Sequence, residues 1–342
     1  MLSSLFKLNT EPSKGVIDIL KKTTLGSNGG LYQHLNTEAR VLDLDNPLFL
    51  TLERNDKVLG NVTFCRRNGH WYIRYFAFQS MFQSTGKHKS RAGGKSKIKN
   101  ELKLFFEDAL KTGFRGEKVS EFYAYVDPEN VKSLWLTEEL GFKTIREIEL
   151  RTFSRVAPKN KIDVVRSGDW SEIPEFIISR LQKKDYFFLQ EFMKGEYYFV
   201  KNETEEIICF AKITNLDWRI ERLPGKFGKI LTKVIPFILG INRIIRPQKH
   251  SFVIPEGVYI KDNCSNLLND FFNSILAEEK RNLILWWVDP IDGLYSTIKN
   301  KIKWGVLNKL IGVTQVNVIS KTLNNKSETS KQSFHISGTD MG

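Results

Sequence analysis

Hydrophobic residues in the first part of the chain recur with two periods, first that of strands and later that of helices. Three runs rich in β-branched and aromatic residues are separated by the turn pairs Asn55-Asp56 and Asn68-Gly69, which predicts an antiparallel meander. The apolar spacing then becomes helical, and Gly113 ends the first long helix. In chain order we expect a helix over 16–22, a Gly-rich loop over 23–32, strands over 47–53, 58–66 and 70–79, a helix over 98–110, a strand over 122–126, a helix over 129–140 and an extended segment over 142–153.

The second half of the sequence repeats this order of elements. They are expected at 173–181, 186–192, 197–201, 207–213, 251–260, 265–278, 282–288, 294–302 and 313–320. The segment Ala124-Tyr-Val-Asp-Pro128 is echoed by Trp286-Trp-Val-Asp-Pro290. One shared corner could arise by chance, but the matching order favours duplication.

These patterns predict an α/β (α+β) protein with mixed sheets, since helices alternate with strands only after each meander. We expect two tandem domains, 1–157 and 163–322, joined by a polar linker that carries Pro158. The last residues, 323–342, are rich in Ser, Lys and Thr, which is typical of a disordered tail.

Composition narrows the class of protein without choosing the function. A chain of 342 residues with 41% hydrophobic residues can bury a sizeable core. The net charge of +13 attracts anions such as polyphosphates, acidic proteins or anionic lipids, but no nucleic-acid-binding motif accompanies it, so no nucleic acid partner is expected. The three cysteines, Cys65, Cys209 and Cys264, are far apart, which suits a reducing compartment. Cys65 and Cys209 lie in apolar runs and are expected to be buried thiols. We expect a cytoplasmic protein without a metal.

A basic loop between a strand and a helix is the first candidate for chemistry. Residues 87–99 contain six Lys or Arg, two adjacent glycines and no acidic residue. Glycines let backbone N–H groups approach a phosphate closely, and the following helix N-terminus adds positive potential. An exposed basic loop without a ligand fits the same composition equally well.

The surroundings of this loop resemble the GNAT superfamily of N-acyltransferases. The segment Arg91-Ala-Gly-Gly94-Lys-Ser96 is similar to the family's pyrophosphate-loop pattern [QR]-x-x-G-x-[GA], with Ser in the last position. The segment from Asn130 to Gly141-Phe142 is similar to the later motif N-x-x-A-x-x-L-Y-x-x-x-G-F, with Ser133 for Ala and Thr137 near the place of Tyr. The resemblance covers roughly residues 45–155.

The resemblance implies an acyl-CoA donor, acetyl-CoA or a longer acyl-CoA, bound where two neighbouring parallel strands separate. Backbone groups near Phe78 and Gln79 would then bind pantetheine and polarise the thioester carbonyl. The pyrophosphate would be held by Arg91, Ala92, Gly93, Gly94, Lys95 and Ser96. Asn130 would line the same cleft.

Two further residues are candidates for proton transfer. The family often has a Tyr that protonates the leaving thiolate, and Thr137, a weaker acid with a shorter reach, stands in its place. Amine acylation also needs a base, for which Glu53 near a strand end is the best candidate. A solvated strand-end charge is the competing interpretation of Glu53.

The second repeat lacks the glycine loop and the Asn position, so we expect a degenerate copy that shapes the acceptor site. Its insertion, 222–250, mixes basic and apolar residues. Such a segment either contacts a membrane surface or an acyl chain, or packs as a helical pair in the seam between the domains. The prolines at 224, 236 and 247 divide it into short pieces and favour packing.

Three functions follow from the sequence. The first is transfer of an acyl group, for which the family resemblance favours acetyl, from acyl-CoA to the amine of a small molecule or amino acid. The second uses an acyl carrier protein or a long-chain acyl donor to make an N-acyl lipid. The third is a non-catalytic binding module.

Overall fold

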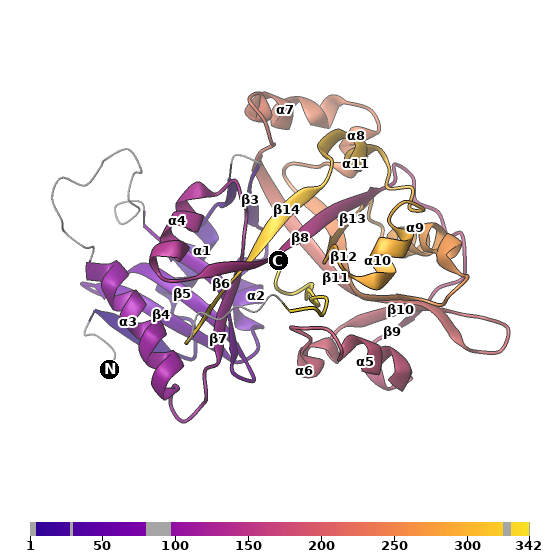
Figure 1. Cartoon of the computed structure of the whole chain (residues 1–342). Helices are drawn as coiled ribbons and strands as arrows, with labels where there is room; N and C mark the ends of the chain where they lie inside the picture. Colours follow the sequence, from indigo (N-terminus) through magenta and orange to yellow (C-terminus); the bar gives the residue numbers. More distant parts are fainter. Residues whose placement is uncertain (1–4, 28–29, 80–96, 324–329, 342) are drawn as a thin grey trace. The chain divides into compact units, whose positions relative to one another are not determined.

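The computed structural model describes residues 5–27, 30–79, 97–323 and 330–341. The chain divides into two compact units, Met1–Arg146 with Asn317–Thr329, and Glu147–Val316 with Ser330–Gly342. The elements of both are labelled in Figure 1. Among the described residues, no helix has the length and apolar character needed to cross a membrane.

The first unit is a mixed sheet with helices packed on it, and its central meander is the predicted one. The sheet order is β1-β4-β5-β6-β7-β14, in which only the β6–β7 contact is parallel. The strands are β1 (Phe6–Asn9), β4 (Pro47–Arg54), β5 (Lys57–Arg67), β6 (His70–Phe78), β7 (Glu121–Val126) and β14 (Thr314–Thr322), beside a short hairpin of β2 (Leu25–Ser27) and β3 (Gly30–His34). The helices are α1 (Lys14–Lys22), α2 (Thr37–Leu42), α3 (Lys97–Thr112) and α4 (Val131–Glu139).

The core of the first unit lies on both faces of this sheet. On one face α3 packs aromatic side chains against β7, with the rings of Phe106 and Phe122 4.8 Å apart between centroids. On the other face α1 and α2 bury Val16 and Val41 against Phe49 of β4. The alternating strand pattern therefore has apolar residues on both sides, as in a sheet covered by helices.

The second unit repeats the mixed-sheet arrangement. Its sheet order is β8-β13-β12-β11-β10-β9, and the β12–β13 contact is parallel. The strands are β8 (Lys143–Ser154), β9 (Val165–Ser167), β10 (Glu196–Lys201), β11 (Ile207–Arg222), β12 (His250–Ile260) and β13 (Leu283–Val288). The α-helices are α5 (Glu175–Leu181), α6 (Leu189–Phe192), α7 (Gly228–Val234), α8 (Ile241–Ile244), α9 (Leu268–Glu278), α10 (Gly293–Ile298) and α11 (Val306–Ile311), and the 3₁₀ turns are η2 (Trp170–Glu172), η3 (Ile235–Phe237) and η4 (Ser265–Leu267).

The boundaries of the two units differ from the expected domain limits at 157 and 322. The second half of β14 pairs with β7 from Asn317↔Val126 to Thr322↔Glu121, so the last strand completes the first unit. Residues 147–154 of β8 correspondingly belong to the second unit. Each unit is thus completed by a strand that the sequence order alone would give to the other.

The described part of the tail is packed, although a disordered tail was expected over 323–342. Phe334 and Ile336 are buried in the second unit, and Asp185 N–H donates to Ser333 O over 3.0 Å. The predicted burial of Cys65 and Cys209 is confirmed.

Candidate functional site

The two parallel strands of the first unit separate part-way along their length. β6 and β7 pair only at His70↔Glu121, Trp71↔Phe122 and Tyr72↔Tyr123, although both strands continue beyond these pairs. The pairing of β6 with β5 shifts immediately afterwards, from Phe64↔Ile73 to Thr63↔Tyr75, so Arg74 is an extra residue. A β-bulge bends its strand and increases its twist. The bulge therefore accounts for the divergence of β6 from β7.

Phe78 and Gln79 stand at the end of the diverging strand. The Gln79 N–H donates to Leu59 O over 2.9 Å, and its side-chain amide donates to Val58 O over 3.1 Å. Successive peptide groups of a strand point in opposite directions, so the Phe78 N–H is directed away from β5, toward the side where β7 has diverged. Of the two predicted residues, Phe78 is the one whose backbone faces the opening.

A glycine fixes the ring of Phe78. Gly60 lies opposite Phe78 in the β5–β6 register, and a Cβ at Gly60 would lie 2.2 Å from the Phe78 ring. The Phe76 ring packs beside it, with centroids 5.1 Å apart. The absence of a side chain at Gly60 thus lets the aromatic ring lie directly on the neighbouring strand.

Helices α3 and α4 follow β6 and β7, and an ion pair connects them. Lys99 Nζ lies 2.5 Å from Glu139 Oε2 and also lies over the Trp135 ring. The predicted pyrophosphate residues from Arg91 to Ser96 lie outside the described residues, directly before α3 at Lys97. Their role stays a prediction.

Asn130 and Thr137 both use their side chains within α4. Asn130 Oδ1 accepts from the Ser133 N–H over 3.2 Å and caps the helix N-terminus. The Thr137 hydroxyl donates to carbonyls of its own helix, those of Ser133 at 3.0 Å and Leu134 at 2.9 Å. Thr137 would have to leave these acceptors before it could protonate a thiolate.

The structure does not bring Glu53 together with these residues. Its carboxylate is 2.6 Å from Lys7 Nζ and accepts from the Thr51 hydroxyl over 3.1 Å. The hydrogen bond from Lys7 lowers the pKa of Glu53 below its ordinary value. The register aligns its neighbour Leu52 with Gly60 and Phe78 across three strands, which places Glu53 roughly 10 Å from Phe78 at ordinary strand spacing.

A polar cluster around β3 was missed by sequence reasoning. Tyr32 and His34 of β3 have ring centroids 6.0 Å apart. Burial, and then the charges of Arg40 and Arg74, hold the pKa of His34 well below its ordinary value, so the imidazole is neutral at pH 7. Burial raises the pKa of Tyr32, and so does the charge of Asp127, just after β7. These side chains thus lie near both diverging strands.

The only sequence signal for this cluster was the alternation of residues 31–34 after a glycine. It was too short to separate a strand from the Gly-rich loop that we expected there. Gly26 of β2 and Gly30 of β3 have φ angles of +90° and +147°, and the two strands pair as an antiparallel hairpin.

The second unit has a corresponding strand divergence. β12 and β13 pair in parallel only at Val253↔Ile284. The register of β12 against β11 shifts between Phe210↔Tyr259 and Lys212↔Glu256. The extra residue falls beside Gly257, whose φ of +63° suits a glycine bulge. A β-bulge beside a diverging pair of parallel strands therefore occurs in both halves, as duplication predicts.

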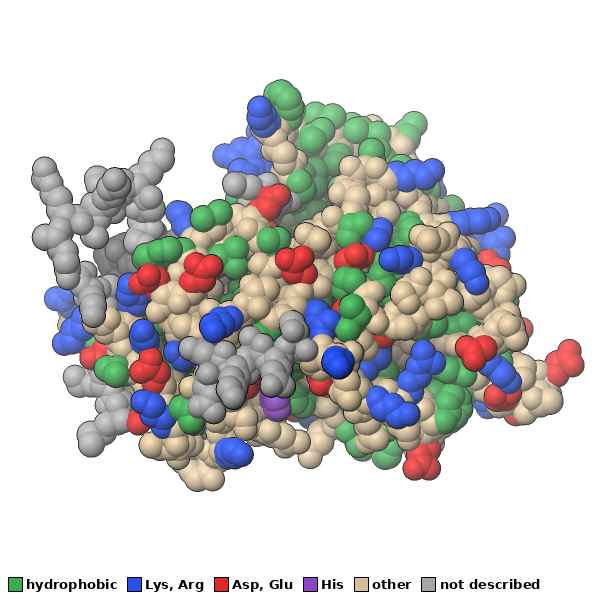
Figure 2. Space-filling view, in the orientation of Figure 1, with side chains coloured by type: hydrophobic (Ala, Val, Ile, Leu, Met, Phe, Trp, Pro, Cys, Tyr) green, Lys and Arg blue, Asp and Glu red, His purple; other side chains and the backbone are tan. Residues whose placement is uncertain are grey.

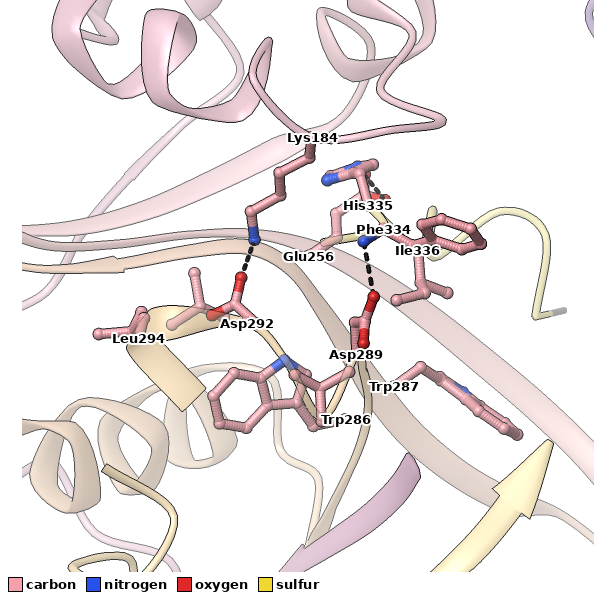
Figure 3. A pocket seen from close by; sticks show the side chains of 13 residues that line it. Lys184, Glu256, Trp286, Trp287, Asp289, Asp292, Leu294, Phe334, His335 and Ile336 are labelled. Carbon is pink, nitrogen blue, oxygen red and sulfur yellow. Dashed lines mark hydrogen bonds and ion pairs between the residues drawn. The ribbon is translucent and has the colours of Figure 1, made fainter. Parts of the chain in front are cut away.

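In the second unit, residues near the C-terminus fill this opening. Figure 3 shows Phe334, His335 and Ile336 against the ends of β12 and β13. The Phe334 N–H donates to Asp289 Oδ2 over 2.8 Å, and the Gly338 N–H donates to Glu256 Oε2 over 2.5 Å. The remaining cavity is about 30 Å³, which leaves room for only a few water molecules.

A buried ion pair between β11 and β12 lies beside the opening of the second unit. Lys212 Nζ is 2.6 Å from Glu256 Oε1, and both side chains are almost fully buried. Burial opposes ionisation of Glu256, yet Lys212 and His335 lower its pKa below the ordinary value. The ionised carboxylate can therefore accept the backbone N–H of Gly338.

A scan against protein-family models and a search of curated protein sequences find no match to this chain. Solved structures do match it. Saccharomyces cerevisiae N-myristoyltransferase with bound myristoyl-CoA has a TM-score of 0.56 at 9% identity, over 94% of this chain and 80% of that chain. A putative acetyltransferase from Pyrococcus horikoshii has a TM-score of 0.50 at 12% identity, over 100% of this chain and 98% of that chain.

The chain has the GNAT acyltransferase fold. The meander, the parallel pair β6–β7 and the helices α3 and α4 occur in the predicted order, and the predicted fold class is confirmed. The divergence of β6 from β7 is the separation of strands that the GNAT resemblance implied. At these identities the likeness concerns the fold alone.

Proposed function

We propose that the protein is an acyl-CoA-dependent N-acyltransferase whose donor binds in the first unit. The observation that carries the proposal is the end of the β6–β7 ladder at Tyr72↔Tyr123, immediately before the bulge at Arg74. Diverging parallel strands expose backbone groups to a ligand where a sheet would otherwise pair them. The second unit has the same divergence, but its own chain fills the opening.

The acyl donor would lie along β6, with its carbonyl toward the Phe78 N–H. The segment Arg91 to Ser96, which precedes α3, would hold the pyrophosphate, because its glycines and the N-terminus of α3 suit an anion. Asn130 would act by fixing the start of α4 beside the donor. The yeast relative is described with myristoyl-CoA, which favours a CoA thioester over an acyl carrier protein.

The reaction requires two proton movements. The neutral amine attacks the thioester carbonyl, the C–S bond breaks, and the thiolate takes a proton, while a base takes the proton that the amine loses. Because the Thr137 hydroxyl donates to carbonyls of its own helix, we propose that water protonates the thiolate, and Thr137 is the alternative acid. Glu53 is one proposed base, and we add His34, because its imidazole is neutral, half-buried and near both diverging strands.

The acceptor is proposed to be an amine of a small molecule or an amino acid. An N-acyl lipid made from a long-chain donor is the second candidate, favoured by the apolar, basic surface of residues 226–239 described below. Acyl transfer to a panel of amines, measured with acetyl-CoA and with myristoyl-CoA, separates the two. Preference for the longer donor would favour the lipid product.

Calorimetric titration of the full chain with acetyl-CoA and longer acyl-CoAs tests the proposal. We expect one site per chain, and a weaker affinity for Gly94→Val, because a side chain there would obstruct approach of the phosphate. Gly293→Val is the matched control, since a Cβ at Gly293 meets no atom within 4 Å in the described part of the second unit. Absence of binding by any acyl-CoA would overturn the proposal, and binding without turnover would favour the binding module.

A further inference from the structure

The insertion of the second unit presents a surface that plays no part in the proposed acyl-donor site. It comprises α7, η3 and the residues beside them, Lys226 to Leu239, and we refer to it as the α7 surface. The side of α7 that faces the unit is fixed by close contacts. A Cβ at Gly228 would lie 1.8 Å from Leu223 O, and the Leu223 N–H donates to Thr232 Oγ1 over 3.0 Å.

The outward side of α7 is apolar. Phe227, Ile230, Leu231 and Val234 follow the i, i+3, i+4, i+7 spacing of one helix face, with exposed fractions of 69%, 59%, 43% and 44%. In a helix that serves only to cover a core, this face would point inward. Here the inward positions are instead taken by Gly228, Thr232 and Ile235.

The turn after α7 extends the same apolar surface. Phe237 is 84% exposed and Leu239 92% exposed, more than any other large hydrophobic side chain that the structure describes. In Figure 2 hydrophobic side chains gather over the α7 region beside Lys and Arg side chains. A contiguous apolar patch of this kind marks an interaction site. Phe237 and Leu239 are therefore not covered by the rest of the second unit.

Charge decides which partner fits. Lys229 and Lys233 lie on α7 beside its apolar face, and Lys226 stands in the turn just before the helix. From Arg222 to Pro255 the sequence contains seven Lys or Arg and no Asp or Glu. A second copy of this surface would bring like charges together across a two-fold contact. An apolar face flanked by cations instead complements an anionic lipid headgroup layer above acyl chains.

We propose that the α7 surface docks on an anionic phospholipid bilayer. Phe237 and Leu239 enter the acyl boundary, the apolar face of α7 lies on the interface, and the three lysines contact lipid phosphates. The seven residues of α7 make a helix roughly 10 Å long, which suits lying in the interface. This docking is independent of the proposed acyl transfer and is tested without any activity.

Vesicle co-sedimentation of the full chain tests the docking. We expect binding to phosphatidylcholine vesicles that contain phosphatidylserine, little binding to phosphatidylcholine alone, and weaker binding at high salt. The double variant F237S/L239S should lower the partition coefficient at least tenfold, because two inserted side chains are lost. The matched control is Leu310→Ser, at a side chain 63% exposed on α11, and it should bind like the wild type.

The charge component has its own variants. Each of Lys226→Gln, Lys229→Gln and Lys233→Gln should weaken binding about fivefold on anionic vesicles, whereas Lys309→Gln should not. Equal binding to neutral vesicles, no binding to anionic ones, or unchanged binding by F237S/L239S would overturn the proposal. Self-association without vesicles that the same double variant abolishes would also overturn it, in favour of a second copy as partner.

Discussion

His250 provides a pH-dependent contribution to the stability of the second unit. Burial lowers its pKa from 6.5 to about 4, so between these values the unfolded chain binds the proton and the folded chain does not. The free energy of unfolding should therefore fall as pH falls from 6.5 to 4, on the order of 3 kcal/mol from this group. Equilibrium unfolding of wild type and His250→Phe across this range checks it, since the variant should lose that part of the slope.

Thr137 and His34 allow the proton-transfer proposals to be separated. Because the Thr137 hydroxyl already donates within α4, we expect Thr137→Val to change kcat by less than about threefold, an effect well below that of losing a general acid. A loss of a hundredfold, recovered by Thr137→Ser, would instead establish the hydroxyl as the acid.

His34→Gln should lower kcat by about 10²-fold or more if the imidazole is the base. Its lowered pKa predicts that wild-type activity persists well below pH 6.5, because the neutral form persists there. Glu53→Gln is the comparison: a large loss in that variant, with none in His34→Gln, would assign the base to the carboxylate. Steady-state kinetics across pH measure both.

At the scale of elements, the glycine bulge of β12 can be tested against a matched position. Gly257→Ala meets a positive φ of 63° and places Cβ 2.8 Å from the Phe192 ring. Gly225→Ala meets a φ of 88° with no atom within 4 Å among the described residues. We expect destabilisation of about 1 kcal/mol at Gly225 and about 2–4 kcal/mol at Gly257, where overpacking adds to the backbone cost. If denaturant unfolding shows an equal loss of unfolding free energy in the two variants, the Phe192 ring moves aside to accept the new Cβ.

The same scale explains how much the sequence could predict. The long elements β4, β5, β6 and α3 were placed within a few residues because their periodicity is sustained. β1 and the β2–β3 hairpin were missed because strands of three to five residues carry little pattern, and β1 acquires its conformation by pairing with β4. The divergence of β6 came from family resemblance, whereas the bulge at Arg74 that causes it depends on a register that no local pattern records. The ion pair of Glu53, the candidate base, with Lys7 could not be predicted for a similar reason, since it joins residues 46 positions apart.

The two similar halves differ at their strand openings. In the second unit Phe334, His335 and Ile336 line the opening, whereas in the first unit β14 pairs with β7 on the edge away from β6. Duplication therefore does not imply two equivalent ligand sites. If one half binds the donor and the other half is degenerate, each chain should bind one acyl-CoA.

The variant Phe334→Ala tests whether the second unit can bind an acyl-CoA. Phe334 is 5% exposed and packs against Tyr186 with ring centroids 4.7 Å apart, so its truncation should destabilise the second unit by about 3–5 kcal/mol. If the donor binds only in the first unit, calorimetry at a temperature where the variant remains folded should still find one acyl-CoA per chain, with affinity within twofold of wild type. Phe176→Ala, at an exposed aromatic of the same unit, controls for loss of a ring. A second acyl-CoA bound by Phe334→Ala alone would mean that residues near the C-terminus exclude a ligand from a competent second site, and the degenerate-copy interpretation would fail.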